Sequence, residues 1–120
     1  MTNNVITFNV PVRKAKSREI ETAMRSGTVV WLPVGSRKVC FVLQHDDDGK
    51  PVALAHYQSG MLVGYLRDAQ IEYMCARGPY VRLTPRAAAA ALIAKAAACK
   101  GVDAVLAVMD AAPHLNAGRL

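Results

Sequence analysis

The chain has 120 residues, of which 52% are hydrophobic and 20% are charged, and its formal net charge is +6. This composition is typical of one globular domain and argues against an intrinsically disordered chain. Three cysteines, Cys40, Cys75 and Cys99, lie far apart in apolar surroundings. Their odd number argues against a disulfide framework and favours a reducing compartment. We expect a single domain over residues 1–120, with loose termini at 1–4 and 114–120.

The same composition argues against export and against a membrane span. The first four residues are polar and lack the basic start and apolar run of a signal peptide. Lys95, Lys100 and Asp103 interrupt the alanine-rich region, and each would be costly inside a bilayer. The sequence therefore predicts a cytoplasmic protein without a membrane partner.

The first elements are predicted as a strand and a short helix. Residues 5–12 alternate between apolar and polar positions, which predicts a strand, and Pro11 indicates an edge position or a strand end. Ser17 is a suitable cap for a short helix over 18–25, which Gly27 would close.

A run of strands follows. The β-forming segments lie at 28–34, 39–44, 51–57 and 61–66. Turn residues separate them at 35–36, 46–49 and 59–60. The pattern predicts a meander of four strands.

Residues 68–77 fit either a strand or a helix. Their apolar residues alternate as in a strand, yet most of the others are helix formers and Gly78-Pro79 is a strong helix stop. We favour a short helix there, with 80–83 as a linking segment or a short edge strand.

Residues 85–100 predict a helix with two apolar faces. Thr84 caps its first turn, Pro85 fits the first helical position, and Gly101 ends it. One face is a core stripe of Ala89, Leu92, Ile93, Ala96 and Cys99. The opposite face, beside Lys95, consists of Ala87, Ala90, Ala91, Ala94 and Ala98.

A second helix over 102–112 completes a helical hairpin. Val102, Val105 and Met109 share one side of this helix with Leu106, and Pro113 ends it. Strands first and helices last predict an α+β fold. We expect an antiparallel sheet of four to five strands, with the C-terminal helix pair packed on one face.

The chemistry-bearing residues do not indicate a metal site, a cofactor or an enzyme. The cysteines and histidines lack the spacing of a local chelate, and the Asp46-Asp47-Asp48-Gly49 sequence is typical of a turn. Cys40 and His56 lie on neighbouring predicted strands and are the best candidate for a nucleophile beside a base. A buried, neutral cysteine is the usual outcome in such an apolar strand, so we predict a protein that is not an enzyme.

Nucleic-acid binding is the alternative function. Basic residues are concentrated between positions 13 and 38, and they are Arg13, Lys14, Lys16, Arg18, Arg37 and Lys38. Exposed aromatic residues such as Trp31, Phe41, Tyr57 or Tyr65 would stack on bases. The helix pair is not a helix-turn-helix reader, because its second helix lacks side chains that contact base edges. Contacts from the 13–18 segment would be unspecific and salt-sensitive.

Protein association is the function that the sequence favours. Small alanine side chains on the outer face allow close approach of another chain, and about 500–800 Å² per partner would form a contact of standard size. Alanine used simply as the best helix former is the other interpretation. We predict a non-catalytic regulator, inhibitor or accessory factor that binds a protein partner or itself as a homodimer. The alanine content suggests a bacterial, phage or plasmid source.

Overall fold

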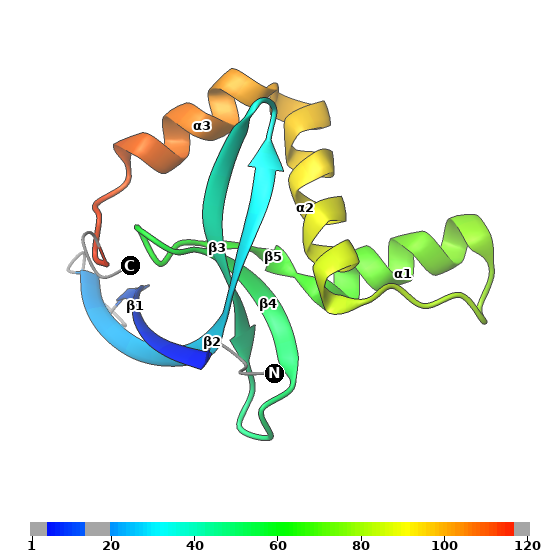
Figure 1. Cartoon of the computed structure of the whole chain (residues 1–120), viewed down its shortest axis with the longest axis horizontal. Coiled ribbons are helices and arrows are strands. Elements are labelled where there is room, and N and C mark those ends of the chain that lie inside the picture. The colour runs from blue at the N-terminus through cyan, green and yellow to red at the C-terminus, as the bar shows by residue number, and fades with distance from the viewer. Residues whose placement is uncertain (1–4, 14–19, 117–120) are drawn as a thin grey trace.

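The computed structural model describes residues 5–13 and 20–116 and shows a five-stranded antiparallel sheet with three helices (Figure 1). The strands lie side by side in chain order and are β1 (Val5–Arg13), β2 (Ile20–Val34), β3 (Arg37–His45), β4 (Pro51–His56) and β5 (Leu62–Tyr65). The helices are α1 (Leu66–Arg77), α2 (Pro85–Lys100) and α3 (Val102–Ala111). The predicted α+β fold, its antiparallel sheet and the four-stranded meander are confirmed.

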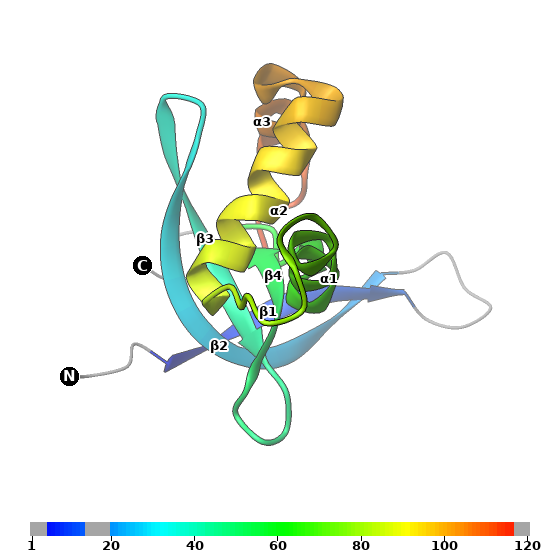
Figure 2. The same ribbon diagram turned by 90° about the vertical axis from the view of Figure 1, so that its right-hand side faces the viewer.

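The sheet is strongly curved, and β2 runs through both of its halves (Figures 1 and 2). The first part of β2 pairs with β1 and its second part pairs with β3. Since neighbouring residues of a strand point to opposite faces, β2 contributes to two separate cores.

One core lies between the sheet and the helices. Its sheet residues include Val30, Leu32, Phe41 and Leu54, and its helix residues include Ala89, Ile93, Val105 and Met109. The helix pair therefore packs on one face of the sheet. The second core lies on the other face and contains Phe8, Val10, Cys40, Val42, Ala55 and Tyr57.

The prediction of a helix over 18–25 is wrong for residues 20–25, because these residues belong to β2. Residues 18 and 19 lie outside the described residues. These residues pair one by one with β1, and this long-range pairing outweighs a weak local preference for helix. Gly27 does not end a helix. A Cβ there would lie 2.5 Å from the main-chain oxygen of Leu43, so this glycine permits close packing inside the sheet.

The remaining elements follow the sequence closely. Residues 68–77 are helical, as part of α1, which begins at Leu66 and ends at Gly78 with φ 110°. In α2, Thr84 accepts a hydrogen bond from the Ala87 N–H at 3.1 Å, and Gly101 ends the helix with φ 88°. β1 lies at the sheet edge, as Pro11 indicates.

Two cysteines differ from the expectation of apolar surroundings. Cys40 is buried in the second core, but Cys75 and Cys99 are exposed. Cys99 was expected in the core stripe of α2. It lies in the last turn, beyond Ile93, the last buried residue of that helix.

The segment after α3 returns to the sheet. Asn116 is fully buried, and its main-chain N–H donates to Gln58 O at 2.9 Å. Its side chain accepts from the Asn9 N–H and donates to Asn9 O and Tyr57 O, each at 2.8 Å. The loose terminus expected at 114–120 is therefore anchored at Asn116, and 117–120 lie outside the described residues.

None of the helices in the described part of the chain is long and apolar enough to cross a membrane.

Candidate functional site

The outer face of α2 is the first candidate surface. Ala90, Ala94 and Ala98 are exposed at a spacing of four residues and form one stripe. Ala87 is partly buried, and Ala91 packs against the core that lies between the sheet and the helices. The face predicted from the sequence is thus divided into an exposed stripe and a part that packs inward.

The outer face of α3 has the same character. Ala104, Ala107, Val108 and Ala111 are exposed, and Val108 is the only large side chain among them. α2 and α3 meet at Gly101, and Gly35 in the β2–β3 turn lies against Val102 at this corner. Both helices therefore present small, uncharged side chains to solvent.

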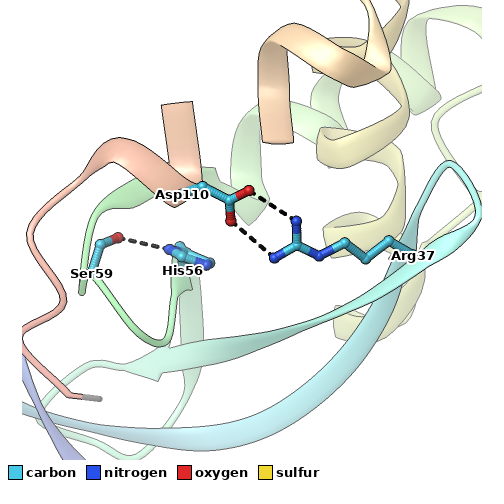
Figure 3. A network of polar contacts seen from close by, with 4 residues as sticks. All are labelled: Arg37, His56, Ser59 and Asp110. Carbon is cyan, nitrogen blue, oxygen red and sulfur yellow. Dashed lines mark hydrogen bonds and ion pairs between the residues drawn. The ribbon is translucent and has the colours of Figure 1, made fainter. Parts of the chain in front are cut away.

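Two charged residues beside these faces, Lys95 of α2 and Asp110 of α3, are paired within the chain, and Asp103 of α3 is exposed. Lys95 Nζ lies 3.0 Å from Glu72 Oε2 of α1. Arg37 of β3 donates two hydrogen bonds, of 3.0 and 2.9 Å, to the two carboxylate oxygens of Asp110 in α3 (Figure 3). The hydrogen bonds from Arg37 lower the pKa of Asp110, and the Asp110 carboxylate raises the pKa of Arg37. Hydrogen bonding to Glu72 likewise raises the pKa of Lys95.

His56 and Ser59 form a buried pair close to Asp110 (Figure 3). His56 Nδ1 lies 2.8 Å from Ser59 Oγ, and that oxygen accepts a hydrogen bond from the Met61 N–H at 3.1 Å. The hydroxyl hydrogen of Ser59 can then be donated to the neutral imidazole. Burial lowers the pKa of His56, and the nearby His114 lowers it further. The hydrogen bonds of this pair stabilise the β4–β5 turn. Ser59 is only 2% exposed, so its hydroxyl is not accessible as a nucleophile.

Cys40 and His56, the enzyme candidate from the sequence, are not brought together. Cys40 belongs to the second core with Ala55 and Tyr57, the neighbours of His56 in the chain. The His56 ring points to the other face of the sheet, where it packs edge-on against the Phe41 ring with the two ring centroids 6.0 Å apart. Burial also raises the pKa of the Cys40 thiol to about 11, which disfavours the reactive thiolate.

Of the basic residues chosen for nucleic-acid binding, the structure describes the side chains of Arg37 and Lys38 alone. Arg13 ends β1, and Lys14, Lys16 and Arg18 lie outside the described residues. Arg37 is bound to Asp110, and Lys38, the next residue of β3, points to the opposite face of the sheet. The binding role of the 13–38 region stays a prediction.

The aromatic residues considered for base stacking are also divided. Trp31 and Tyr65 are exposed, at 53% and 54%, but they lie on different strands separated by β3 and β4. Phe41 and Tyr57 are core residues and cannot stack on a base.

A cleft that the sequence does not predict lies beside α1. It has a volume of about 730 Å³ and is lined by the β3–β4 turn, the start of α1, the linker before α2 and the first turns of α2. Three cationic residues, Lys50, Arg67 and Arg82, line it together with Tyr65. Because its walls come from four separate segments, no local sequence pattern points to it.

A smaller cleft of about 330 Å³ lies between α1 and α2. Its lining includes Glu72 and Lys95, and the ion pair between them joins the two helices. Among the described residues, no group of three or more His, Cys, Asp or Glu side chains is arranged to hold a metal ion.

In comparisons with known proteins, the chain matches no family model, no curated protein and no solved structure.

Proposed function

We propose that this chain is a small non-catalytic binding protein, acting as a regulator, inhibitor or accessory factor. It docks on another protein through the outer faces of α2 and α3, and a second copy of the same chain is the first candidate partner. One observation carries this proposal: both faces consist mainly of small uncharged side chains, and two of the charges beside them, Lys95 and Asp110, are already paired within the chain.

Small side chains support docking because they let two helix backbones approach closely. The stripe of Ala90, Ala94 and Ala98 presents no long side chain that must be ordered or displaced on contact. Val108 on α3 adds a larger apolar group that is 51% exposed in the isolated chain. Burying such surface against a partner is favourable by about 25 cal/mol per Å².

The paired charges limit the electrostatic cost of docking. Lys95 and Asp110 keep their intramolecular partners, so both ion pairs can remain at the solvent-exposed rim of an interface. Exposed pairs of this kind contribute little stability, and they need not be broken for an apolar surface to form beside them.

The area of the two faces limits the expected affinity of docking. Helices of 16 and 10 residues are about 24 and 15 Å long, and a strip about 10 Å wide along both covers roughly 400 Å². A standard interface buries about 800 Å² per partner. A homodimer through these faces alone is therefore expected to be weak, and a larger complementary partner would bind more tightly.

Within the described residues, the pair considered for catalysis from the sequence is not assembled. Cys40 and His56 point to opposite faces of the sheet, and the Ser59 hydroxyl beside His56 is buried.

The test is sedimentation velocity of the full chain over roughly 1 µM to 1 mM, because weak dimers fall within this range. We expect the mean mass to rise with concentration for the wild type. Ala94→Glu and, separately, Ala107→Glu should restore the monomer, because each introduces an unpaired charge into the contact. Thr22→Glu is the matched control, since it places the same charge on an exposed position of β2.

A pull-down extends the test to a different partner. The wild-type chain is used as bait beside the Ala94→Glu and Thr22→Glu variants, and a specific partner should be lost only with Ala94→Glu. A wild-type chain that stays monomeric and retains no partner sensitive to Ala94→Glu or Ala107→Glu would refute the proposal.

A further inference from the structure

The cleft beside α1 has the dimensions of a ligand site. Its volume of about 730 Å³ lies within the range of roughly 300–1,000 Å³ typical of small-molecule pockets. It is separate from the docking faces proposed above, since α2 contributes only Pro85 and Ala88 to its lining.

The floor of the cleft is apolar. Leu66 and Ala88 are buried there, and Val52 and Leu83 are partly buried beside them. These side chains come from β4, α1, α2 and the linker between the helices. Such a floor favours the apolar body of a ligand, because contact removes hydrocarbon surface from water on both sides.

The charged residues around this floor are mainly cationic. Within the described part of the chain, Lys50 and Arg67 make no hydrogen bond or ion pair through their side chains. Arg82 is held in place by hydrogen bonds from Nη1 to Pro79 O, at 3.0 Å, and to Met74 Sδ, at 2.9 Å, so its other guanidinium nitrogens are the ones available to a ligand. All three carry a positive charge near neutral pH.

Two carboxylates also line the cleft, and one of them is already engaged. Asp46 Oδ1 accepts hydrogen bonds from the main-chain N–H groups of Asp48, at 3.0 Å, and Lys50, at 2.9 Å. Asp68 lies in the first turn of α1 and is exposed. The three cations outnumber the two carboxylates, so an anionic group is favoured over a cationic one.

The walls of the cleft are fixed before any ligand arrives. Gln70 of α1 holds the linker at two points, since its Nε2 donates to Val81 O at 3.1 Å and its Oε1 accepts from the Leu83 N–H at 2.7 Å. On the other side, the bonds to Asp46 fix the β3–β4 turn. A preformed site binds more tightly because less conformational entropy is lost on binding.

We propose that this cleft binds a small organic anion with an aromatic or apolar body. The body lies on the floor formed by Val52, Leu66, Leu83 and Ala88 and beside the exposed ring of Tyr65, while the anionic group lies among Lys50, Arg67 and Arg82. The geometry thus assigns two kinds of contact to one ligand, and each can be removed separately.

The probe for the test is anilinonaphthalene sulfonate, an aromatic anion that fluoresces in apolar sites, and N-phenylnaphthylamine is its uncharged counterpart. We expect the wild type to bind the sulfonate. The double variant Lys50→Gln/Arg67→Gln should bind it at least roughly tenfold more weakly. Binding of the uncharged probe should change little. A double variant at two exposed cations outside the cleft, Arg25→Gln/Lys100→Gln, is the matched control for net charge.

The site of binding is read from amide chemical-shift changes on addition of the sulfonate. Shifts centred on residues 50–52, 65–67 and 82–83 support the proposal. No binding to the wild type, equal affinity of both double variants, or shifts centred on the outer faces of α2 and α3 would overturn it. Because Ala94→Glu lies outside the cleft, it should bind the probe normally, which separates this result from that of the docking proposal.

Discussion

Replacing Asn116 by alanine removes the side-chain hydrogen bonds that join the end of the described chain to β1 and to the β4–β5 turn. The side chain accepts from the Asn9 N–H and donates to Asn9 O and Tyr57 O, each at 2.8 Å. We expect Asn116→Ala to fold into the same structure with a clearly lower free energy of unfolding.

The size of this loss follows from the burial of each bond. The bond to Tyr57 O is fully buried, and losing it costs about 1–2 kcal/mol. The two bonds to Asn9 are partly buried, and each contributes about 0.5–1 kcal/mol. The total is about 2–4 kcal/mol, which corresponds to a lowering of Tm by about 10–15 °C for a domain of this size.

The measurement is urea unfolding followed by circular dichroism, with the slope m compared between variants to confirm that the same surface unfolds. Asn9→Ala is the matched control, because among the described residues the Asn9 side chain makes a single long hydrogen bond, of 3.5 Å, to Leu115 O. It should cost less than about 1 kcal/mol. If Asn116→Ala unfolds within about 0.5 kcal/mol of the wild type, the anchoring of this segment is wrong.

Three further predictions test the packing and the buried groups. Gly60→Ala should lower the free energy of unfolding by more than about 2 kcal/mol, because φ is 70° and the new Cβ would meet the main chain of β1. Gly49→Ala is its control: φ is 79° but the space around it is open, so the free energy of unfolding should fall by about 1 kcal/mol. Alkylation with iodoacetamide at pH 7.5, followed by mass spectrometry, should modify the two exposed cysteines long before Cys40, whose pKa burial raises to about 11; rapid modification of Cys40 in the folded chain would contradict its burial. The lowered pKa of His56 means that the unfolded chain binds more protons below its ordinary pKa of 6.5, so stability should fall as the pH drops below that value. His56→Gln should weaken this dependence just below pH 6.5, and an unchanged slope there would show that another group is responsible.

Most of the fold could be predicted because its signals are local. Turns at 35–36, 46–49 and 59–60 divide the meander, and each contains a glycine with positive φ. Thr84 and Gly101 define the ends of α2 in the same way. The prediction for residues 20–25 failed because their strand conformation depends on pairing with β1 across an intervening segment. The preference for a strand there comes from the partner strand and not from the local sequence.

The relation between Cys40 and His56 could not be predicted for a related reason. Which face a residue occupies depends on strand register, and a slip of one residue moves its side chain to the other face. The pairing of β3 with β4 shifts between Gln44 and His45, so alternation cannot simply be counted across the turn. The Asn116 contacts and the cleft beside α1 likewise join segments that are distant in sequence.

The position of Asn116 also bears on the order in which the chain assembles. β1 is synthesised early, and the residue that binds the outward main-chain groups of Asn9 follows 107 positions later. Until then, the edge of β1 offers unpaired N–H and C=O groups to any other strand, apart from Pro11, which has no N–H. Contacts between such distant residues form late in folding. A nascent or C-terminally shortened chain is therefore the form of this protein most open to strand pairing with its neighbours.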